Sequence, residues 1–296
     1  MAEPQNDRER RVAIYWDLEN VVLSQYGACH GKNAWGKRGD LSPEEVTRRL
    51  EQAHVDLSAV LDFAATIGVA TINRAYGDWS SSHLRQYDQD LLRHAVDLVQ
   101  LFPLAGSKNG ADIRMAIDVV EDLSAHQHVT DVLLVTGDSD FVSLVQRCRR
   151  HGRRVTAVGV RGSTSPYLTS ACDLFRYYDR LAAKSGLSKA RPVPVARSLL
   201  VSVDAPTRAL VTTALTQLSQ QSADGWVRRA SVKPVLLRLD AAFDEADSEA
   251  RNFTEFMEAL SDLCDAKTGE HDVFYRLRPA SPVAKQPRAA AVSRQA

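Results

Sequence analysis

The sequence predicts an α/β protein: a mainly parallel, Rossmann-like sheet flanked by helices, followed by a small winged-helix-like α+β domain. Short apolar runs rich in β-branched residues alternate with helical patterns up to about residue 178. Such alternation is typical of a parallel sheet covered on both faces. Aspartates directly follow two of the runs, at Asp17 and Asp138, and from residue 182 the composition becomes basic.

Six buried strands are expected in the first domain, because each is a short apolar run bounded by turn residues. They span residues 11–16, 69–76, 96–102, 132–136, 154–160 and 174–178. Helices are expected at 42–67, 80–94, 111–125, 141–151 and 163–172. Ser42 and Pro43 form a typical helix start, and the segment Ser24 to Asp40, rich in Gly, Lys and Trp, is expected to be a loop.

The expected helix at 111–125 has a regular apolar pattern. Ile113, Ala116, Ile117 and Val120 follow the i, i+3, i+4, i+7 spacing, which predicts that this face is buried.

We expect four segments: an α/β domain at 1–181, a basic linker at 182–205, a second domain at 206–278, and a disordered tail at 279–296. The stretch 182–203 carries four Lys or Arg residues and two prolines but no acid. The second domain shows helical patterns from Pro206, Ser231 and Asn252 and a closing strand at 273–277.

Composition narrows the function classes. The chain has 296 residues with 37 basic and 37 acidic side chains, so nucleic-acid binding would have to rest on local patches. The four cysteines are scattered, without a C-x-x-C pair, which fits reduced thiols. The first 11 residues contain no apolar signal segment, and no run approaches the ~18 apolar residues of a membrane span. We therefore expect a cytoplasmic protein without a membrane partner.

Carboxylates collect at one predicted edge of the sheet. Asp17 follows the first strand, Asp112 opens the helix after the third, and Asp138 and Asp140 follow the fourth. Ligands of open parallel sheets bind at the carboxyl ends of the strands. Oxygen donors of this kind suit Mg²⁺ or Mn²⁺, which activate water and neutralise a phosphate in phosphodiester hydrolysis. Each acid alone is better explained as a turn or helix cap, but together they favour a metal site.

Neighbouring polar residues are candidates for supporting roles. Asn20 could orient a phosphate or a metal-bound water, while Thr136 and Ser139 could hydrogen-bond the carboxylates. Asp118 lies about 120° around the helix from Asp112, which favours a surface salt bridge over ligation. For Glu19, solvent exposure and contact with the site are equally expected.

Three motifs resemble those of the NYN domain, a branch of the PIN-like ribonucleases. They are Y-W-D-L-E-N (Tyr15 to Asn20), K-N-G-A-D-I (Lys108 to Ile113) and V-T-G-D-S-D-F (Val135 to Phe141), and H-G-x-x-V (His151 to Val155) follows the third. The resemblance runs from about Val12 to Tyr178. It implies Mg²⁺- or Mn²⁺-dependent cleavage of RNA, with Asp17, Asp112, Asp138 and Asp140 binding metal and Asn20 beside them.

The second domain resembles the OST-HTH (LOTUS) module in pattern. The matching features are the G-W-V turn at Gly225, the helix S-V-K-P-V-L-L-R-L, the helix F-T-E-F-M-E-A-L and the closing V-F-Y-R-L. This resemblance implies RNA binding or docking of a protein partner, and no catalytic residue.

Cations are needed along any RNA-binding cleft. Candidates near the acidic edge are Lys108, Arg114, Arg74 and Arg161. Lys32, Lys37 and Arg38 surround Trp35 and could hold a single strand by charge and stacking, although most such residues are simply solvated. Trp226 is expected in a core rather than as a stacking platform.

The leading hypothesis is a divalent-metal-dependent ribonuclease acting on single-stranded RNA, with a C-terminal module that binds RNA or protein. A non-catalytic RNA-binding adaptor is the alternative, disfavoured by the complete acidic set. A phosphatase or receiver-type protein ranks last, because the segment after the fifth strand offers Arg161 rather than a lysine.

Overall fold

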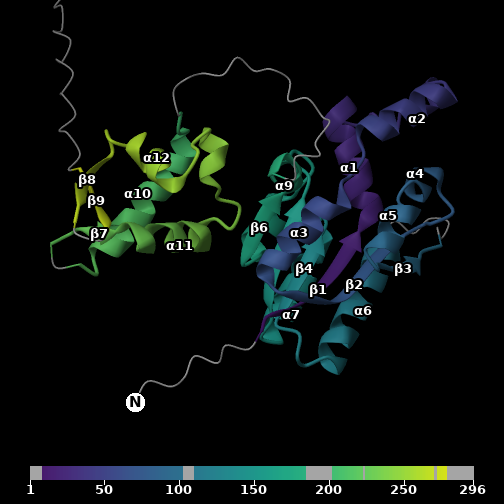
Figure 1. Cartoon of the computed structure of the whole chain (residues 1–296), viewed down its shortest axis with the longest axis horizontal. Helices are drawn as coiled ribbons and strands as arrows, with labels where there is room; N and C mark the ends of the chain where they lie inside the picture. The colour runs from purple at the N-terminus through teal and green to yellow at the C-terminus, as the bar shows by residue number, and fades with distance from the viewer. Residues whose placement is uncertain (1–8, 103–109, 185–201, 223, 270–271, 279–296) are drawn as a thin grey trace, which may run out of the picture. The chain divides into compact units, whose positions relative to one another are not determined.

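The computed structural model describes residues 9–102, 110–184, 202–222, 224–269 and 272–278 (Figure 1). The described residues divide into two compact units. The first comprises those within 1–199 together with 236–244, and the second those within 200–235 and 245–296. Lys108, most of the expected linker and the expected C-terminal tail lie outside the described residues.

A six-stranded parallel sheet forms the centre of the first unit, in the order β3-β2-β1-β4-β5-β6. This confirms the predicted fold class. Successive strands are added in one direction from β1 to β3 and in the opposite direction from β4 to β6, so the order of the strands reverses between β1 and β4, which pair in parallel from Val12↔Asp131 to Trp16↔Val135. The strands are β1 (Arg11–Asp17), β2 (Val69–Gly77), β3 (Asp97–Gln100), β4 (Asp131–Val135), β5 (Arg154–Gly159) and β6 (Leu174–Tyr177).

Helices cover both faces of this sheet, because the β1 side chains alternate between two apolar cores. Val12, Ile14 and Trp16 pack in one core, and Ala13 and Tyr15 in the other. The first core is covered by α1 (Leu18–His30), α3 (Leu57–Ile67), α4 (Ser82–Arg85), α5 (Asp88–Arg93) and α9 (Tyr178–Lys184). The second is covered by α6 (Gly110–Ala125), α7 (Val142–Arg150) and α8 (Pro166–Ala171).

The helix expected at 42–67 is two helices, α2 (Pro43–Gln52) and α3. Ser42 caps α2, accepting a hydrogen bond from the Glu45 amide at 3.3 Å. Asp56 caps α3. Tyrosine hydroxyls from α5's N-terminal side and from α9 accept hydrogen bonds from the amides of Val55 and Asp56, which satisfies the interrupted backbone.

Two other helix predictions need correction. Residues 24–30 are not loop but the end of α1, which stops at Gly31, where φ is 103°. The expected helix at 80–94 is split into α4 and α5.

The buried face of α6 also differs from the prediction. Ile113 and Ile117 are 59% and 49% exposed, while Met115, Val119 and Leu123 are buried against the sheet. The apolar period was right, but the packed face is rotated around the helix.

The second unit is a small α+β unit with a three-stranded antiparallel sheet in the order β7-β9-β8. The predicted closing strand is β9 (Val273–Leu277), while β8 (Cys264–Thr268) was not predicted. Its core includes Val211, Leu215 and Phe256. The other elements are α10 (Ala205–Ser219), β7 (Val227–Arg228), α11 (Arg229–Leu239), a short 3₁₀ turn (Glu245–Ser248) and α12 (Phe253–Glu258); residues 236–239 of α11 are grouped with the first unit. Among the described residues, the helices are too short or too polar to cross a lipid bilayer.

Candidate metal centre

Asp17 lies at the carboxyl end of β1, the central strand, and is only 7% exposed. Its Oδ2 accepts a hydrogen bond from the Thr136 hydroxyl at 3.0 Å. Thr136 directly follows β4, so this bond joins the carboxyl ends of β1 and β4, the two strands between which the strand order reverses. Asp17 is thereby held at the switch point of the sheet, where parallel α/β folds bind ligands.

The turn after β4 carries two more acids. Asp138 Oδ1 accepts the amide of Asp140 at 3.0 Å, capping the short 3₁₀ turn Ser139–Phe141 that leads into α7. The Thr136 hydroxyl accepts the Asp138 amide at 3.2 Å. Thr136 therefore hydrogen-bonds the carboxylate of Asp17 and the backbone amide of Asp138.

Gly137 is packed between β1's following helix and the segment after β5. Its amide donates to Asn20 Oδ1 at 3.5 Å, and its carbonyl accepts the Ser165 amide at 2.9 Å. A Cβ at this position would lie 3.1 Å from the Thr164 hydroxyl, so only glycine fits without a shift. The turn bearing Asp138 is therefore held on both sides.

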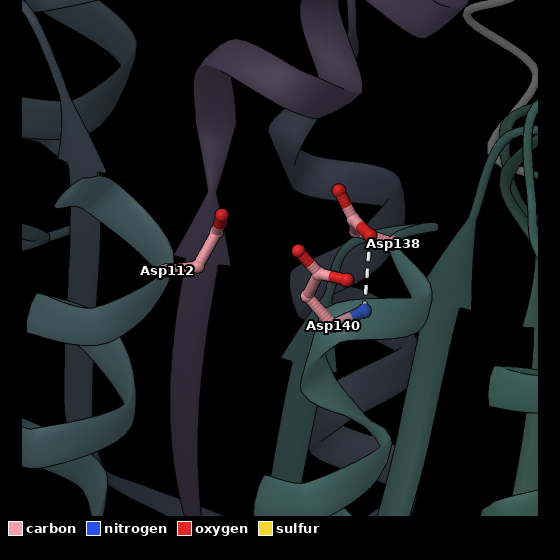
Figure 2. A group of neighbouring side chains, drawn as sticks. All are labelled: Asp112, Asp138 and Asp140. Atoms are coloured by element: carbon pink, nitrogen blue, oxygen red, sulfur yellow. Dashed lines mark hydrogen bonds between the residues drawn. The ribbon is translucent and has the colours of Figure 1, made fainter. Parts of the chain in front are cut away.

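Asp112 in the first turn of α6 completes the group. One carboxylate oxygen each from Asp112, Asp138 and Asp140 lies within 4.8 Å of the others. Figure 2 shows that Asp112 comes from a separate helix, whereas Asp138 and Asp140 share one turn. We call these three residues with Asp17 the acidic site.

The pKa values of two acids reflect this crowding. Burial, opposed by the Thr136 hydrogen bond and reinforced by the charges of Asp112 and Asp138, raises the pKa of Asp17 to about 7. Burial, with the charges of Asp138 and Asp140, raises the pKa of Asp112 to about 6. A cation placed between the clustered carboxylates would relieve their repulsion.

The donor set fits a hard divalent cation, because all candidate ligands are carboxylate oxygens and no sulfur or histidine nitrogen belongs to the group. The sequence-predicted acids are thus brought together, three in one group and Asp17 beside it through its interactions with Asp112 and Asp138.

The predicted RNA-contacting arginines are all held by acids. Arg114 pairs with Asp118 at 2.9 Å, and Arg161 pairs with Asp179 at 3.3 Å while lying over the Tyr177 ring. Arg74 pairs with Asp122 at 2.8 Å; it lies three residues before the end of β2, not at it. Their side chains remain 58%, 45% and 24% exposed, in the order given, so Arg114 and Arg161 are the more accessible.

Asp118 and Glu19, the two acids left outside the predicted metal set, have partners elsewhere. Asp118 is a salt-bridge residue as expected but is buried, not superficial, and also accepts the Tyr76 hydroxyl at 3.0 Å. Glu19 Oε1 lies 3.2 Å from His83 Nε2. Neither His83 nor Tyr76 lies in a motif or at a spacing that would predict these contacts from the sequence.

Arg38, one of the predicted loop cations, contacts an aromatic cluster. Arg38 lies 4.3 Å over the Trp35 ring, which packs edge-on against Tyr26 and His83. Trp35 is therefore held in place by ring contacts on two sides, with its cation partner exposed at the surface.

An open parallel sheet with carboxylates at its switch point is typical of α/β proteins that bind a ligand or metal at the carboxyl ends of the strands. A family model identifies the particular family. The family model described as the NYN domain matches residues 11–179. The chain therefore belongs to the NYN family, which is part of the PIN-like nuclease superfamily.

Two curated relatives are similar to part of this chain. An uncharacterized protein of Methanocaldococcus jannaschii is 27% identical over 42% of this chain and 48% of its own length. Another, of Sinorhizobium fredii, is 33% identical over 28% of this chain and 40% of its own. The chain thus spans less than half the length of these relatives. A Vibrio parahaemolyticus protein of unknown function has a solved structure similar over 58% of this chain and 95% of its own, at 23% identity and a TM-score of 0.45.

Proposed function

We propose that the protein is a Mg²⁺- or Mn²⁺-dependent ribonuclease that hydrolyses phosphodiester bonds of single-stranded RNA. The observation that carries the proposal is the acidic site: three carboxylates within 4.8 Å and a buried fourth beside them, at the switch point of a parallel sheet. Membership of the NYN family supports the same activity.

Asp112, Asp138 and Asp140 would hold the cation, with Asp17 beside them. When bound, a divalent cation supplies an activated water and neutralises charge on the phosphate. Asp17 is kept in one orientation by Thr136, and Asp138 by the Asp140 amide. The Asn20 carbonyl oxygen accepts the Gly137 amide, which leaves its NH₂ group to donate to a phosphate oxygen.

The substrate would be guided by cations at the same edge. Arg161, which lies over the Tyr177 ring, and the exposed Arg114 of α6 would contact phosphates, and Lys108 and Arg74 are further candidates. Ser139, between the two acids of the turn, is the remaining supporting residue proposed.

The second unit would act as an RNA- or protein-binding module resembling OST-HTH domains. Trp226 is half-buried rather than fully enclosed, and Arg276 lies 4.5 Å from its ring. Lys267 lies on the same ring at 5.8 Å. A partly exposed ring flanked by two cations can stack a base while the cations meet phosphates.

The test is RNA cleavage by Asp138→Asn. In Mn²⁺, the wild type should cleave single-stranded RNA, and the variant should lose about 100-fold or more in rate, equivalent to about 3 kcal/mol. Asp88→Asn, which removes an exposed carboxylate on α5, is the matched control and should cleave normally. Equal RNA degradation by wild type and Asp138→Asn would overturn the proposal, and tight RNA binding with no turnover in any metal would identify an adaptor.

A further inference from the structure

The end of α7 and the turn into β5 form the most basic segment of the first unit. Residues 147–154, here called the arginine turn, read R-C-R-R-H-G-R-R and contain five arginines, one histidine and no acid. Arg147, Arg149, Arg150 and Arg154 are exposed, while His151 and Arg153 are half-buried. None of the roles assigned above uses this segment.

The arginine turn lies at the opposite end of α7 from the acidic site. The turn bearing Asp138 leads into the start of α7, and the helix returns to the beginning of β5, where Arg154 pairs in register with Asp131, the first residue of β4. A nine-residue helix is about 14 Å long. One helix therefore separates the acids from the arginines by the length of a few nucleotides.

A pocket of about 370 Å³ opens beside the arginine turn. It is lined by Leu123, Ser124, Gln127, His151 and Arg153, from the ends of α6 and α7. The Arg153 Nε is buried and has no hydrogen-bond partner among the described residues. A buried guanidinium N–H without an acceptor costs about 1–3 kcal/mol, a cost that an anionic oxygen in the pocket would remove.

The charge of the arginine turn is not cancelled by its surroundings. Of the nearby acids, Asp173 pairs with Arg149 and Asp131 pairs with Arg10. Within the described parts of the chain, Arg147, Arg150 and Arg154 have neither a side-chain hydrogen bond nor an ion pair. Arg147 and Arg150 are one helical turn apart, so they project from the same side of α7.

We propose that the arginine turn and its pocket bind the phosphate backbone of single-stranded RNA at a second contact surface, away from the acidic site. One guanidinium group can donate two parallel hydrogen bonds to a phosphate, and several neighbouring arginines can bind successive phosphates of a nucleic acid. An acidic protein segment would also be attracted, but RNA is favoured because the same helix presents at its other end the acids proposed to cut RNA. The inference rests on the proposed function and specifies how its substrate is held.

The test combines Arg147→Gln, Arg150→Gln and Arg154→Gln in the full chain. Binding of a long single-stranded oligouridylate is measured against salt concentration in EDTA, so that no cleavage intervenes. Loss of three phosphate contacts should reduce the slope of log affinity against log salt by about 2, at about 0.7 per contact. A dinucleotide is too short to span α7, so its cleavage in Mn²⁺ should stay at the wild-type rate.

A triple variant with the same charge change is the control: Arg48→Gln, Arg85→Gln and Arg93→Gln, all exposed in the first unit. It should keep the wild-type salt slope. Equal slopes in the two triple variants would overturn the inference and leave an acidic protein as the partner of the arginine turn. A wild type that cleaves no RNA, with the slope still reduced in the first triple variant, would overturn the proposed function alone.

Discussion

Among the described carboxyl groups, Asp17 has the pKa that folding raises most. Its pKa rises to about 7, mainly through burial, against an ordinary value near 4 in the unfolded chain. A group whose folded pKa is raised stabilises the fold at low pH and loses that contribution as the pH rises through its folded pKa. Without metal, the protein should therefore lose stability between pH 4 and pH 8, by up to about 4 kcal/mol from Asp17.

Thermal unfolding in EDTA across this pH range measures the effect. Asp17→Asn should flatten the pH dependence and unfold at a higher temperature than the wild type at pH 8. The Asp88→Asn variant should follow the wild type. A wild-type protein whose stability rises steadily from pH 5 to pH 8 would contradict the burial of an ionisable Asp17.

Metal should reverse this trend, because a cation binds the ionised carboxylates and competes with protons. We expect Mn²⁺ to raise the unfolding temperature more at pH 8 than at pH 5, and Asp112→Asn to reduce the gain at both. Calorimetry with and without Mn²⁺ measures it. A metal-induced shift of the same size in wild type and Asp112→Asn would place the ion elsewhere.

The acids of the site were predictable residue by residue, and their surroundings were not. Asp17, Asp138 and Asp140 directly follow apolar runs, so the parallel sheet alone places them at one edge. The burial of Asp118 depends on Tyr76, which is 42 residues away in the chain. No local pattern encodes such a pairing.

At the scale of elements, two tyrosines fix α6 to the sheet. Tyr15 and Tyr76 donate to Asp122 and Asp118 at 3.0 Å, and the same helix carries Asp112 in its first turn. Tyr76→Phe removes a buried donor from Asp118 and should lower the free energy of unfolding by about 1–3 kcal/mol. It should also weaken Mn²⁺ binding, because Asp112 moves with α6.

Chemical denaturation and Mn²⁺ titration measure these two effects. Tyr167→Phe is the control, since Tyr167 is 76% exposed and its substitution should change neither. Unchanged stability in Tyr76→Phe would show that the Tyr76–Asp118 bond does not hold α6.

The orientation of α6 is a feature that the sequence pattern does not predict. Ile113 and Ile117 fit an apolar stripe as well as Met115 and Val119 do, so periodicity gives the helix but not its orientation. In the structure, the stripe with Met115 and Val119 is buried. Asp118 and Asp122 on the same helix accept hydrogen bonds from tyrosines of the sheet. The break between α2 and α3 has a similar cause, because tyrosine hydroxyls from distant segments satisfy its amides.

At the scale of the whole molecule, the second unit should add RNA affinity without changing the chemistry. Trp226→Ala in the full chain should lower affinity for a long single-stranded RNA several-fold, with a loss of about 1–3 kcal/mol for one stacked base. The cleavage rate at saturating RNA should not change. Filter binding and single-turnover kinetics separate the two, with circular dichroism as the check on folding.

Leu239→Ala is a matched control, because Leu239 is 41% exposed on α11 and carries no polar or stacking group. Equal affinity of Trp226→Ala and wild type would assign the second unit to a protein partner instead.

The position of the acidic site also has a consequence for biosynthesis. Thr136 and Asp17, whose hydrogen bond joins β1 to β4, are 119 residues apart in the chain. Contacts between distant segments form late in folding, since a long loop must close first. A chain emerging from the ribosome with β1 to α6 complete would carry Asp17 and Asp112 but not the turn of Asp138 and Asp140. The proposed nuclease activity would therefore be absent from the growing protein, beside the messenger that encodes it, until most of the first unit has been made.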